Sequence, residues 1–403
     1  MNEQRAIELR EWEKAKRVTL SSDEANKLRR LEKRLDIQWC GGNEAEVSGK
    51  AGYVGIAALS KETQVIVRPH IPVASVLELA CYAYRFEPPE KSMVEDARLD
   101  NAGPADWLAF LLALEVEKLL AIGLCYGYRE VEEDLPYVQG RINFGALRWG
   151  ESKPSLVPCR FEDFALDTVE NRILRGTLEI LSASPLSATC RRRLHSTLAA
   201  FGRVSLVRPT RLMFDQSPLN RLSRYYEPAL RLCLLVLESS GIELDPGYVA
   251  VPGFFFSMAK AFEKAIERAL GEEFGRQNVH PQHSYSDRIR VIEGKPAIPV
   301  TFIPDNVIGP RNAPCLIVDA KYKKPLIEHH GDRFRNPDLY QAFTYASALN
   351  APVVLVYPRV DEEVEVTLEV GRYEIRVLTV ALDQASVSLC VTLRSVLQTL
   401  QTA

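Results

Sequence analysis

The sequence predicts a multidomain α/β protein in three parts. Its 403 residues are 46% hydrophobic, enough to bury more than one core, and a chain of this length usually forms two or three domains. Helical apolar spacing prevails in the middle of the chain, and β-rich runs mark both ends. We therefore predict a helical and β-rich N-terminal domain (residues 1–103), a mainly helical middle domain (104–248) and a C-terminal α/β domain with a mixed sheet (249–403).

In the N-terminal domain we expect two helices within the first forty residues. The second begins at the capping-box pattern of residues 21–24 and ends at the glycine pair 41–42. Its apolar side carries Leu28, Leu31 and Leu35. Alternating and β-branched segments between residues 45 and 72 then predict a small β-rich part. This N-terminal part either docks a partner or serves only as a packing extension.

The middle domain contains the most apolar stretch of the chain, residues 107–124. Three charged residues interrupt it, which predicts a core helix rather than a membrane span: Glu115, Glu117 and Lys118. Further on, Asp167 is the expected N-cap of a helix, with Glu170 as its reciprocal acid. Turn residues at 245–247 and 252–253 place the boundary with the C-terminal domain.

The C-terminal domain is expected to open with an amphipathic helix from Phe254 to Leu270. Its inward residues are Phe255, Ala259, Phe262, Ile266 and Leu270. Two apolar runs, 303–308 and 315–322, follow as strands of a hairpin turned by residues 309–312. A helix over 336–346 comes next, with Leu339, Phe343 and Ala346 at helical spacing. The continuous β-rich run 351–358 then suits a strand buried on both faces.

The two strands of this hairpin carry the residues that indicate chemistry. Side chains alternate along a strand, so Asp319 and Lys321 share one face, and Asp305 lies on the neighbouring strand. Two carboxylates can hold Mg²⁺ while a lysine orients or polarises the attacking water, which is what metal-assisted phosphodiester hydrolysis requires. The sequence therefore points to a nuclease. The alternative is a surface strand with a solvated Asp-Lys pair.

The order helix, strand, strand, strand, helix, strand, with acids on the second and third strands, resembles the PD-(D/E)xK nuclease superfamily. In that superfamily the acids bind a divalent metal, the lysine serves the nucleophilic water, and many members add a helix glutamate and a later glutamine. The resemblance implies a restriction-endonuclease-like C-terminal domain. It implies catalytic roles for Asp305, Asp319, Lys321, Glu263 and Gln341. It also implies that Mg²⁺ or Mn²⁺ is held by Asp305, Asp319, Glu263 and the carbonyl of Ala320.

From about residue 65 to 360 the chain resembles the McrC family. The resemblance rests on residues 73–84, 139–142 and 167–174 and on the Phe262-Glu263 helix with the nuclease motif. McrC proteins are nuclease subunits of restriction systems whose partner is a AAA+ GTPase of the McrB type, which recognises modified DNA such as 5-methylcytosine. The resemblance implies cleavage of double-stranded foreign DNA in defence, only when assembled with that motor, and stimulation of its nucleotide hydrolysis.

Three other functions stay open at this point. These alternatives are a non-cutting regulator of a AAA+ motor, a DNA-binding structural module without a motor, and a stand-alone nuclease. A single active site cuts one strand, so a double-strand break needs two copies or two complexes. The roles of Arg141, Asn171 and Arg172 are open between structure and partner contact.

Positive charge is uneven, although the formal net charge is -3. Between residues 191 and 224 there are eight arginines against one acid, Asp215. Clustered arginines neutralise phosphates, so DNA contact is one interpretation, and a partner-binding or simply solvated face is the other. The expected nucleic-acid-binding residues are Arg191, Arg192, Arg193, Arg203, Arg208, Arg211, Lys323, Arg333 and Arg335.

Several patterns exclude other classes. The first twenty residues are a charged mixture without an apolar segment, so we expect neither signal peptide nor membrane association, and a cytoplasmic protein. Eight scattered cysteines without a Cys-x-x-Cys pattern suit free thiols in a reducing compartment. The histidine pairs at 280/283 and 329/330 have no partners at zinc spacing. No phosphate-binding P-loop occurs, so nucleotide hydrolysis belongs to a partner.

Overall fold

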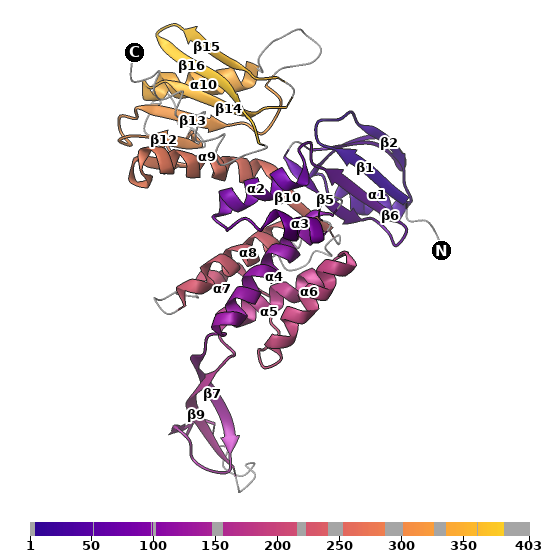
Figure 1. Ribbon diagram of the computed structural model, residues 1–403, viewed down its shortest axis with the longest axis vertical. Coiled ribbons are helices and arrows are strands. Elements are labelled where there is room, and N and C mark those ends of the chain that lie inside the picture. The colour runs from indigo at the N-terminus through magenta and orange to yellow at the C-terminus, as the bar shows by residue number, and fades with distance from the viewer. Residues whose placement is uncertain are drawn as a thin grey trace. The chain divides into compact units, whose positions relative to one another are not determined.

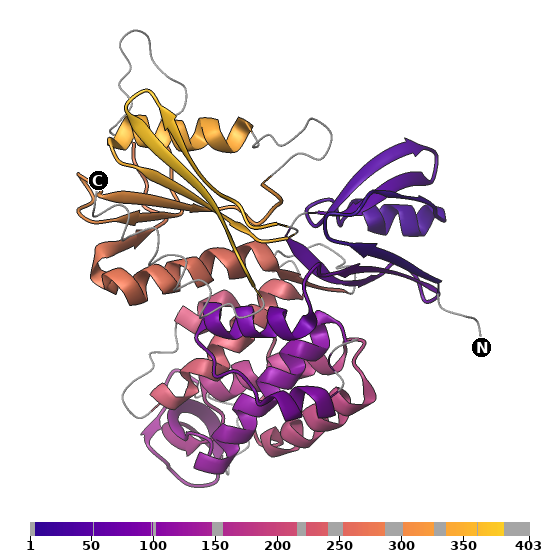
Figure 2. The ribbon, with the colours of Figure 1, turned by 45° about the horizontal axis from the view of Figure 1, so that its top comes forward.

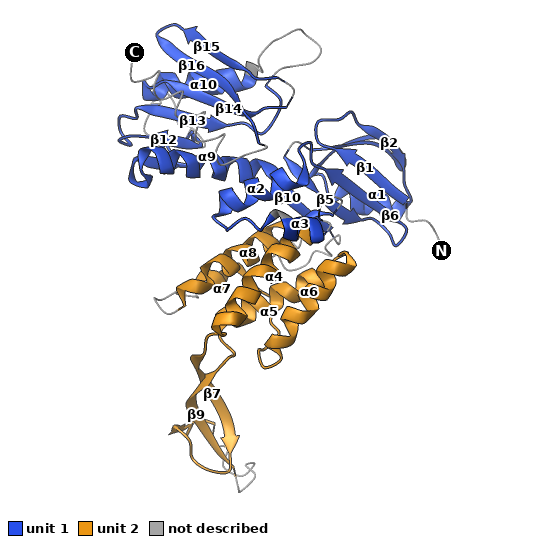
Figure 3. Cartoon of the chain, viewed as in Figure 1, with its two compact units in different colours: residues 1–104, 251–403 blue, residues 105–250 orange. Residues whose placement is uncertain are grey.

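The protein is described by a computed structural model and is a mixed α/β chain with two compact units (Figure 3): residues 1–104 together with 251–403, and residues 105–250. The structure describes residues 5–50, 52–97, 99, 102–146, 156–215, 223–240, 253–286, 301–325, 336–360 and 362–382. Among these residues no helix is long and apolar enough to cross a membrane. The predicted domain boundary signals at 245–247 lie outside the described residues.

The N-terminal part of the first unit is built from two small sheets (Figure 1). Its strands are β1 (Arg5–Arg10), β2 (Lys16–Thr19), β3 (Leu35–Gly41), β4 (Glu44–Gly49), β5 (Tyr53–Ala58) and β6 (Thr63–Arg68), and its helices are α1 (Ser22–Arg29), α2 (Val73–Tyr84) and α3 (Lys91–Asp96). One sheet has the order β1-β6-β5-β10, in which β10 (Gly253–Ser257) comes from the later part of the chain, and the other has the order β2-β4-β3. The β-rich character predicted for residues 45–72 is confirmed.

Two helices are predicted before residue 40, and the prediction of the first is wrong, because residues 5–19 contain β1 and β2. Charged residues favour a helix there, yet Ile7 and Leu9 are buried while Glu8 and Arg10 are exposed, which is the period of a strand. The second helix is confirmed as α1, with both hydrogen bonds of its capping box. It ends at Arg29, and Leu35 already belongs to β3.

The C-terminal part of the first unit is a six-stranded mixed sheet in the order β11-β12-β13-β14-β16-β15. Its elements are β10 (Gly253–Ser257), α9 (Met258–Phe274), β11 (Val279–Pro281), β12 (Asn306–Ile308), β13 (Leu316–Ala320), α10 (Asn336–Leu349), β14 (Val353–Pro358), β15 (Glu365–Val370) and β16 (Tyr373–Val380). β12 and β13 pair antiparallel, as predicted for the hairpin, and β13 pairs parallel with β14. β10 belongs to the N-terminal sheet, where it pairs with β5.

Two helices cover this sheet, α9 and α10, and Figure 2 shows them on opposite faces. The predicted helix start at Phe254 is wrong: residues up to Ser257 form β10, and Ser257 then caps α9. Three bulky aromatic residues in succession favour the strand. α10 is confirmed, with Ala346 in the core, whereas Phe343 is 39% exposed. β14 is buried along its whole length, as predicted.

The second unit is mainly helical, as predicted, but carries a long hairpin that the sequence did not reveal. Its elements are α4 (Pro104–Ile122), β7 (Gly127–Leu135), β8 (Arg141–Ile142), β9 (Val157–Ala165), α5 (Val169–Ser182), α6 (Ala188–Leu198), α7 (Arg211–Asp215) and α8 (Glu227–Ser239). β7 and β9 pair antiparallel over nine residues each. Most of β7 is exposed and rich in acids, so the apolar alternation that predicts a half-buried strand is missing.

Two residues left open by the sequence, Asn171 and Arg172, are structural. Asn171 is fully buried, donates to the carbonyls of Cys125 and Leu166, and accepts from the Tyr226 hydroxyl. The predicted N-cap Asp167 is wrong, because Thr168 accepts from the N–H of Asn171 instead. Asp167 is buried and accepts from Arg129, Arg172 and both donors of Ser205. These bonds fasten β7 and the segment after α6 to the start of α5.

Replacing Asp167 by Ala should lower the free energy of unfolding by roughly 3 kcal/mol, because it leaves the Arg172 guanidinium and the Ser205 N–H without their acceptor. The guanidinium of Arg172 holds the pKa of Asp167 well below its usual range. This stabilisation is therefore present at neutral pH and is lost as the pH falls. Thermal unfolding measures the effect. The matched control is Asp163→Ala, whose pair with Arg129 is solvent-exposed and should change stability by less than about 1 kcal/mol.

Candidate functional site

The hairpin brings Asp305 against the end of β13. Asp305 lies directly before β12, and its Oδ2 accepts the N–H of Ala320 at 2.9 Å. Its Oδ1 accepts from Nε2 of Gln282 at 3.1 Å, a contact that the sequence did not suggest. The Asp305 carboxyl is therefore fixed from both sides. Backbone pairing of β12 with β13 places it beside the next predicted acid, Asp319.

Asp319, Lys321 and Gln341 form one connected group. Asp319 is 1% exposed although it is an acid. Its Oδ2 lies 2.5 Å from Nζ of Lys321, and the same ammonium donates to Oε1 of Gln341 at 2.8 Å. Asp319 and Lys321 come from the end of β13, and Gln341 comes from α10, which packs on that face of the sheet. Four of the five predicted catalytic residues are thus brought together: Asp305, Asp319, Lys321 and Gln341.

The fifth predicted residue, Glu263, lies within electrostatic range of the group. Burial, then the charges of Asp319 and Glu263, raise the pKa of Asp305 from 3.8 to about 7. Burial and the charge of Asp319 likewise raise the pKa of Glu263. Burial disfavours the charged form of Lys321, but Asp319 and Asp305 outweigh it, and the pKa of Lys321 is raised. The site therefore concentrates more negative charge than its one lysine balances.

These residues fit a small divalent cation. Two aspartates and the Ala320 carbonyl offer only oxygen donors, and Mg²⁺ typically binds one or two carboxylates and keeps several waters. A cation would relieve the repulsion that raises the pKa of Asp305. Within the described part of the chain no group of three or more His, Cys, Asp or Glu is arranged to hold a metal ion. Two carboxylates are thus the direct ligands that this site offers, and a role of Glu263 stays a prediction.

Sequence reasoning missed Tyr345, which extends the group. Its hydroxyl accepts from Nε2 of Gln341 at 2.8 Å and donates to the carbonyl of Ile303 at 3.3 Å. Hydrogen bonds therefore run from Lys321 through Gln341 and Tyr345 to the segment before Asp305. The available signal was spacing, because a residue four positions after Gln341 lies one helical turn away on the same face.

Lys323, expected to contact DNA, is held by the fold. Its Nζ lies 2.6 Å from Oδ1 of the buried Asp338, and that carboxylate also accepts from the hydroxyl of Tyr357 at 2.8 Å. The pair fastens the first turn of α10 to the strand end. Arg333 and Arg335 lie outside the described residues. DNA contact by these three residues stays a prediction.

The six arginines predicted in the middle domain fall into two groups. Arg191, Arg192, Arg203, Arg208 and Arg211 are exposed. Arg193 is half-buried, pairs with Glu117 at 2.6 Å and lies over the ring of Phe110. The exposed arginines can reach phosphates, whereas Arg193 already has a structural partner.

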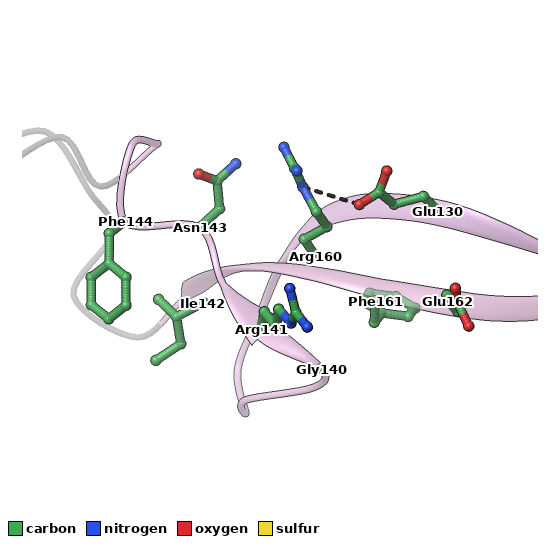
Figure 4. Close-up of a pocket in the computed structure, with 9 residues that line it drawn as sticks. All are labelled: Glu130, Gly140, Arg141, Ile142, Asn143, Phe144, Arg160, Phe161 and Glu162. Carbon is green, nitrogen blue, oxygen red and sulfur yellow. Dashed lines mark ion pairs between the residues drawn. The ribbon is translucent and has the colours of Figure 1, made fainter.

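The hairpin of the second unit holds a hollow of about 660 Å³ that includes Gly140 and Arg141 (Figure 4). Gly140 has a φ of +68°, and a Cβ there would lie 2.5 Å from the carbonyl oxygen of Arg160, so only glycine fits. Arg141 is exposed, and Arg160 pairs with Glu130 across β7 and β9. This acid-rich hairpin also carries exposed aromatic rings, among them Tyr128 and Phe144 at 73% and 75%.

The cysteines described by the structure are free thiols: Cys40, Cys81, Cys125, Cys159, Cys190, Cys233 and Cys315. Four of them are buried, and Cys40 and Cys315 are exposed. Cys390 lies outside the described residues. His280 contacts Arg311 and the ring of His283. The prediction that these histidines form no zinc site stays a prediction.

Comparison with solved structures shows a similar fold. A chain in the refined half-complex of a tetradecameric assembly of Thermococcus gammatolerans McrB AAA+ hexamers with bound McrC is 16% identical. The match covers 97% of this chain and 100% of that one, with a TM-score of 0.61. A chain of the cryo-EM structure of the Thermococcus gammatolerans McrBC complex is 18% identical over 66% of this chain and 87% of that one, with a TM-score of 0.45. No curated protein matches the chain.

A family model decides the assignment. Residues 50–358 match the model described as McrBC 5-methylcytosine restriction system component. The matched range includes β5 and β6 of the N-terminal part, the whole second unit and the Asp305, Asp319, Lys321 and Gln341 group. Because the match spans more than half of the sequence, this chain belongs to the McrBC 5-methylcytosine restriction system component family.

Proposed function

We propose that this chain is the Mg²⁺-dependent DNA endonuclease subunit of a two-component restriction system, with a PD-(D/E)xK nuclease domain in residues 249–403. The observation that carries the proposal is the group of Asp305, Asp319, Lys321 and Gln341 at one end of a mixed sheet, joined by hydrogen bonds and by the ion pair of Asp319 with Lys321. Buried like charges such as those that raise the pKa of Asp305 are costly to a fold and are typical of functional sites. A solvated Asp-Lys pair does not account for an aspartate that is 1% exposed.

In the proposed mechanism Asp305, Asp319 and the carbonyl of Ala320 would hold Mg²⁺, or Mn²⁺ in its place, with Glu263 nearby. When bound, the ion would supply Lewis acidity and would lower the pKa of a coordinated water. Lys321, oriented by Asp319 and Gln341, donates to the attacking oxygen or to the phosphate. Tyr345 keeps Gln341 in place and so orients the lysine.

The proposed partner is a AAA+ GTPase of the McrB type that recognises modified DNA. The similar chain of known structure comes from an assembly of McrB AAA+ hexamers with bound McrC, which supports this partner. The sequence has no P-loop of its own, so the partner supplies nucleotide hydrolysis, and this chain stimulates it. One active site cuts one strand, and a double-strand break then needs two copies or two complexes.

Neutralising the exposed arginines should weaken DNA binding and flatten its salt dependence. Each lost phosphate contact lowers the slope of log K against log salt by about 0.9, so Arg203, Arg208 and Arg211 changed together to Gln should lower it by roughly 2 to 3. Fluorescence anisotropy with duplex DNA at several salt concentrations measures the slope. The same change at Arg10, Arg17 and Arg359 is the control. An unchanged slope would assign the arginine face to a partner or to solvent.

The proposed function is tested by purifying the tagged chain from its host with whatever AAA+ protein binds it. The complex is then incubated with methylated or unmethylated plasmid, Mg²⁺ and either GTP or ATP. Nucleotide-dependent cleavage supports the proposal, and a preference for methylated plasmid identifies the mark. A complex that hydrolyses nucleotide but never cuts under any of these conditions would make the chain a non-cutting regulator instead.

A further inference from the structure

A buried acid from the N-terminal sheet reaches the strand that carries Lys321. Glu11 follows β1 and is 0% exposed. Its Oε2 accepts from the N–H of His70 and from the hydroxyl of Tyr322, each at 3.3 Å. Its Oε1 has no hydrogen-bond partner among the described residues. Burial raises the pKa of Glu11 to about 7. A carboxyl in such surroundings costs folding free energy, and packing alone does not account for it.

Tyr322 is the next residue after Lys321 and points to the opposite face of the sheet. It is 6% exposed, and its ring lies 5.3 Å from the ring of Trp12 and 5.7 Å from that of Phe262. Trp12 has a φ of 63°, in the left-handed region that a bulky residue rarely adopts. Its ring also lies 5.2 Å from that of His70. Two consecutive residues that follow β1, Glu11 and Trp12, thus contact Tyr322.

Because of the position of Tyr322, its contact with Glu11 and Trp12 can affect the geometry of the candidate site. The ladder between β13 and β14 ends where the N–H of Lys321 donates to the carbonyl of Val356. Tyr322 is the first residue beyond that bond, so its side chain fixes the direction in which the strand continues. Phe262, which contacts Tyr322, directly precedes Glu263 on α9. Moving Tyr322 would therefore displace the predicted water-activating lysine and the helix glutamate together.

We propose that Glu11 is a positioning residue of the nuclease site, which holds Tyr322 and through it the geometry of Lys321 and Glu263. The inference rests on the proposed nuclease function. It assigns the N-terminal sheet a part in catalysis that differs from partner docking. Glu11 itself touches neither DNA nor metal in this account, and it acts by hydrogen bonding across 311 positions of sequence.

The test compares Glu11→Ala and Glu11→Gln in the complete complex with its AAA+ partner. Single-turnover cleavage at saturating DNA should fall roughly 10-fold or more for Glu11→Ala, the size typical of outer residues that orient active-site groups. The affinity for DNA and the nucleotide hydrolysis of the partner should not change. Glu11→Gln keeps an oxygen that accepts from Tyr322 and should recover most of the rate. The control is Glu8→Ala, an exposed acid on the same strand.

A second readout does not need cleavage. Pulse acylation with acetic anhydride, read by peptide mass spectrometry, should label Lys321 several-fold faster in Glu11→Ala and in Tyr322→Phe, relative to the exposed Lys61. Tyr322→Phe removes one oxygen only, so it keeps the test valid if Glu11→Ala does not fold. The proposal would be overturned if Glu11→Ala matches the wild type and Glu8→Ala both in the rate of Lys321 labelling and in the rate of DNA cleavage. A wild-type complex that never cuts DNA would instead overturn the proposed nuclease function, while the labelling result would still report on Glu11.

Discussion

Asp319→Ala should abolish DNA cleavage by the complex while leaving its assembly intact. Asp319 is the buried carboxylate that both pairs with Lys321 and is proposed to hold the metal. Losing the metal and the orientation of the lysine removes several kcal/mol of transition-state stabilisation, which corresponds to a rate loss of about 10³-fold or more. Single-turnover kinetics on plasmid DNA measure the loss. Asp319→Asn, nearly identical in shape, should lose as much, because the amide cannot replace the charge.

Two measurements test whether Asp319→Ala affects only cleavage and leaves the rest of the complex intact. Nucleotide hydrolysis and co-purification of the partner should match the wild type, since Asp319 lies inside the sheet of its own domain. Glu369→Ala, at an exposed acid on β15, is the matched control and should cut normally. Cleavage retained by Asp319→Ala in the presence of Mg²⁺ would contradict the proposed role of the carboxylate group.

Asp305→Asn should stabilise the metal-free protein and at the same time remove its activity. The pKa of Asp305 is raised from 3.8 to about 7 by burial and by the charges of Asp319 and Glu263. A raised pKa means that the neutral acid suits the fold, so stability is full below the unfolded pKa and is lost as the pH rises through about 7. At pH 8 the uncharged amide should raise the free energy of unfolding by about 2 kcal/mol, and the gain should shrink as the pH falls and vanish at about pH 3.5, below the unfolded pKa.

Added Mg²⁺ should reverse this order of stability. The cation binds the folded wild type and raises its melting temperature by mass action, whereas Asp305→Asn has lost a charged ligand and should respond weakly. Differential scanning calorimetry with and without Mg²⁺ at both pH values measures all four states. Asp36→Asn, at an exposed acid of β3, should behave as the wild type. A destabilised Asp305→Asn at pH 8 would show that the carboxylate serves the fold rather than a metal.

The candidate site was predictable because its signals are local. Strand alternation is enough to place Asp319 and Lys321 on one face, and the turn residues 309–312 are enough to pair their strand with the one after Asp305. A helix-start pattern and the apolar spacing after it located α10, the helix that carries Gln341. The core of the C-terminal sheet followed from the continuous apolar run of β14.

The rest depends on contacts between distant segments, which no local pattern carries. In the sequence Glu11 does not differ from the other charged residues of the N-terminal segment, and only the pairing of β1 with β6 directs it toward Tyr322. The β7–β9 hairpin has few buried residues, so neither helical nor strand periodicity marks it. Thr168 rather than Asp167 caps α5 because Asp167 is drawn to Arg172 and Ser205. In each case tertiary context outweighs the local preference.

The most direct test of the proposed metal site is anomalous diffraction from crystals of the chain grown or soaked with Mn²⁺. We expect one anomalous peak between the carboxylates of Asp305 and Asp319 and the carbonyl of Ala320, and we expect this peak to be lost in Asp319→Ala crystals. Lys321 should then contact a water molecule that is bound to the ion. Crystals without a peak there, at Mn²⁺ concentrations that support DNA cleavage by the complex, would contradict the assignment of these residues as the metal ligands.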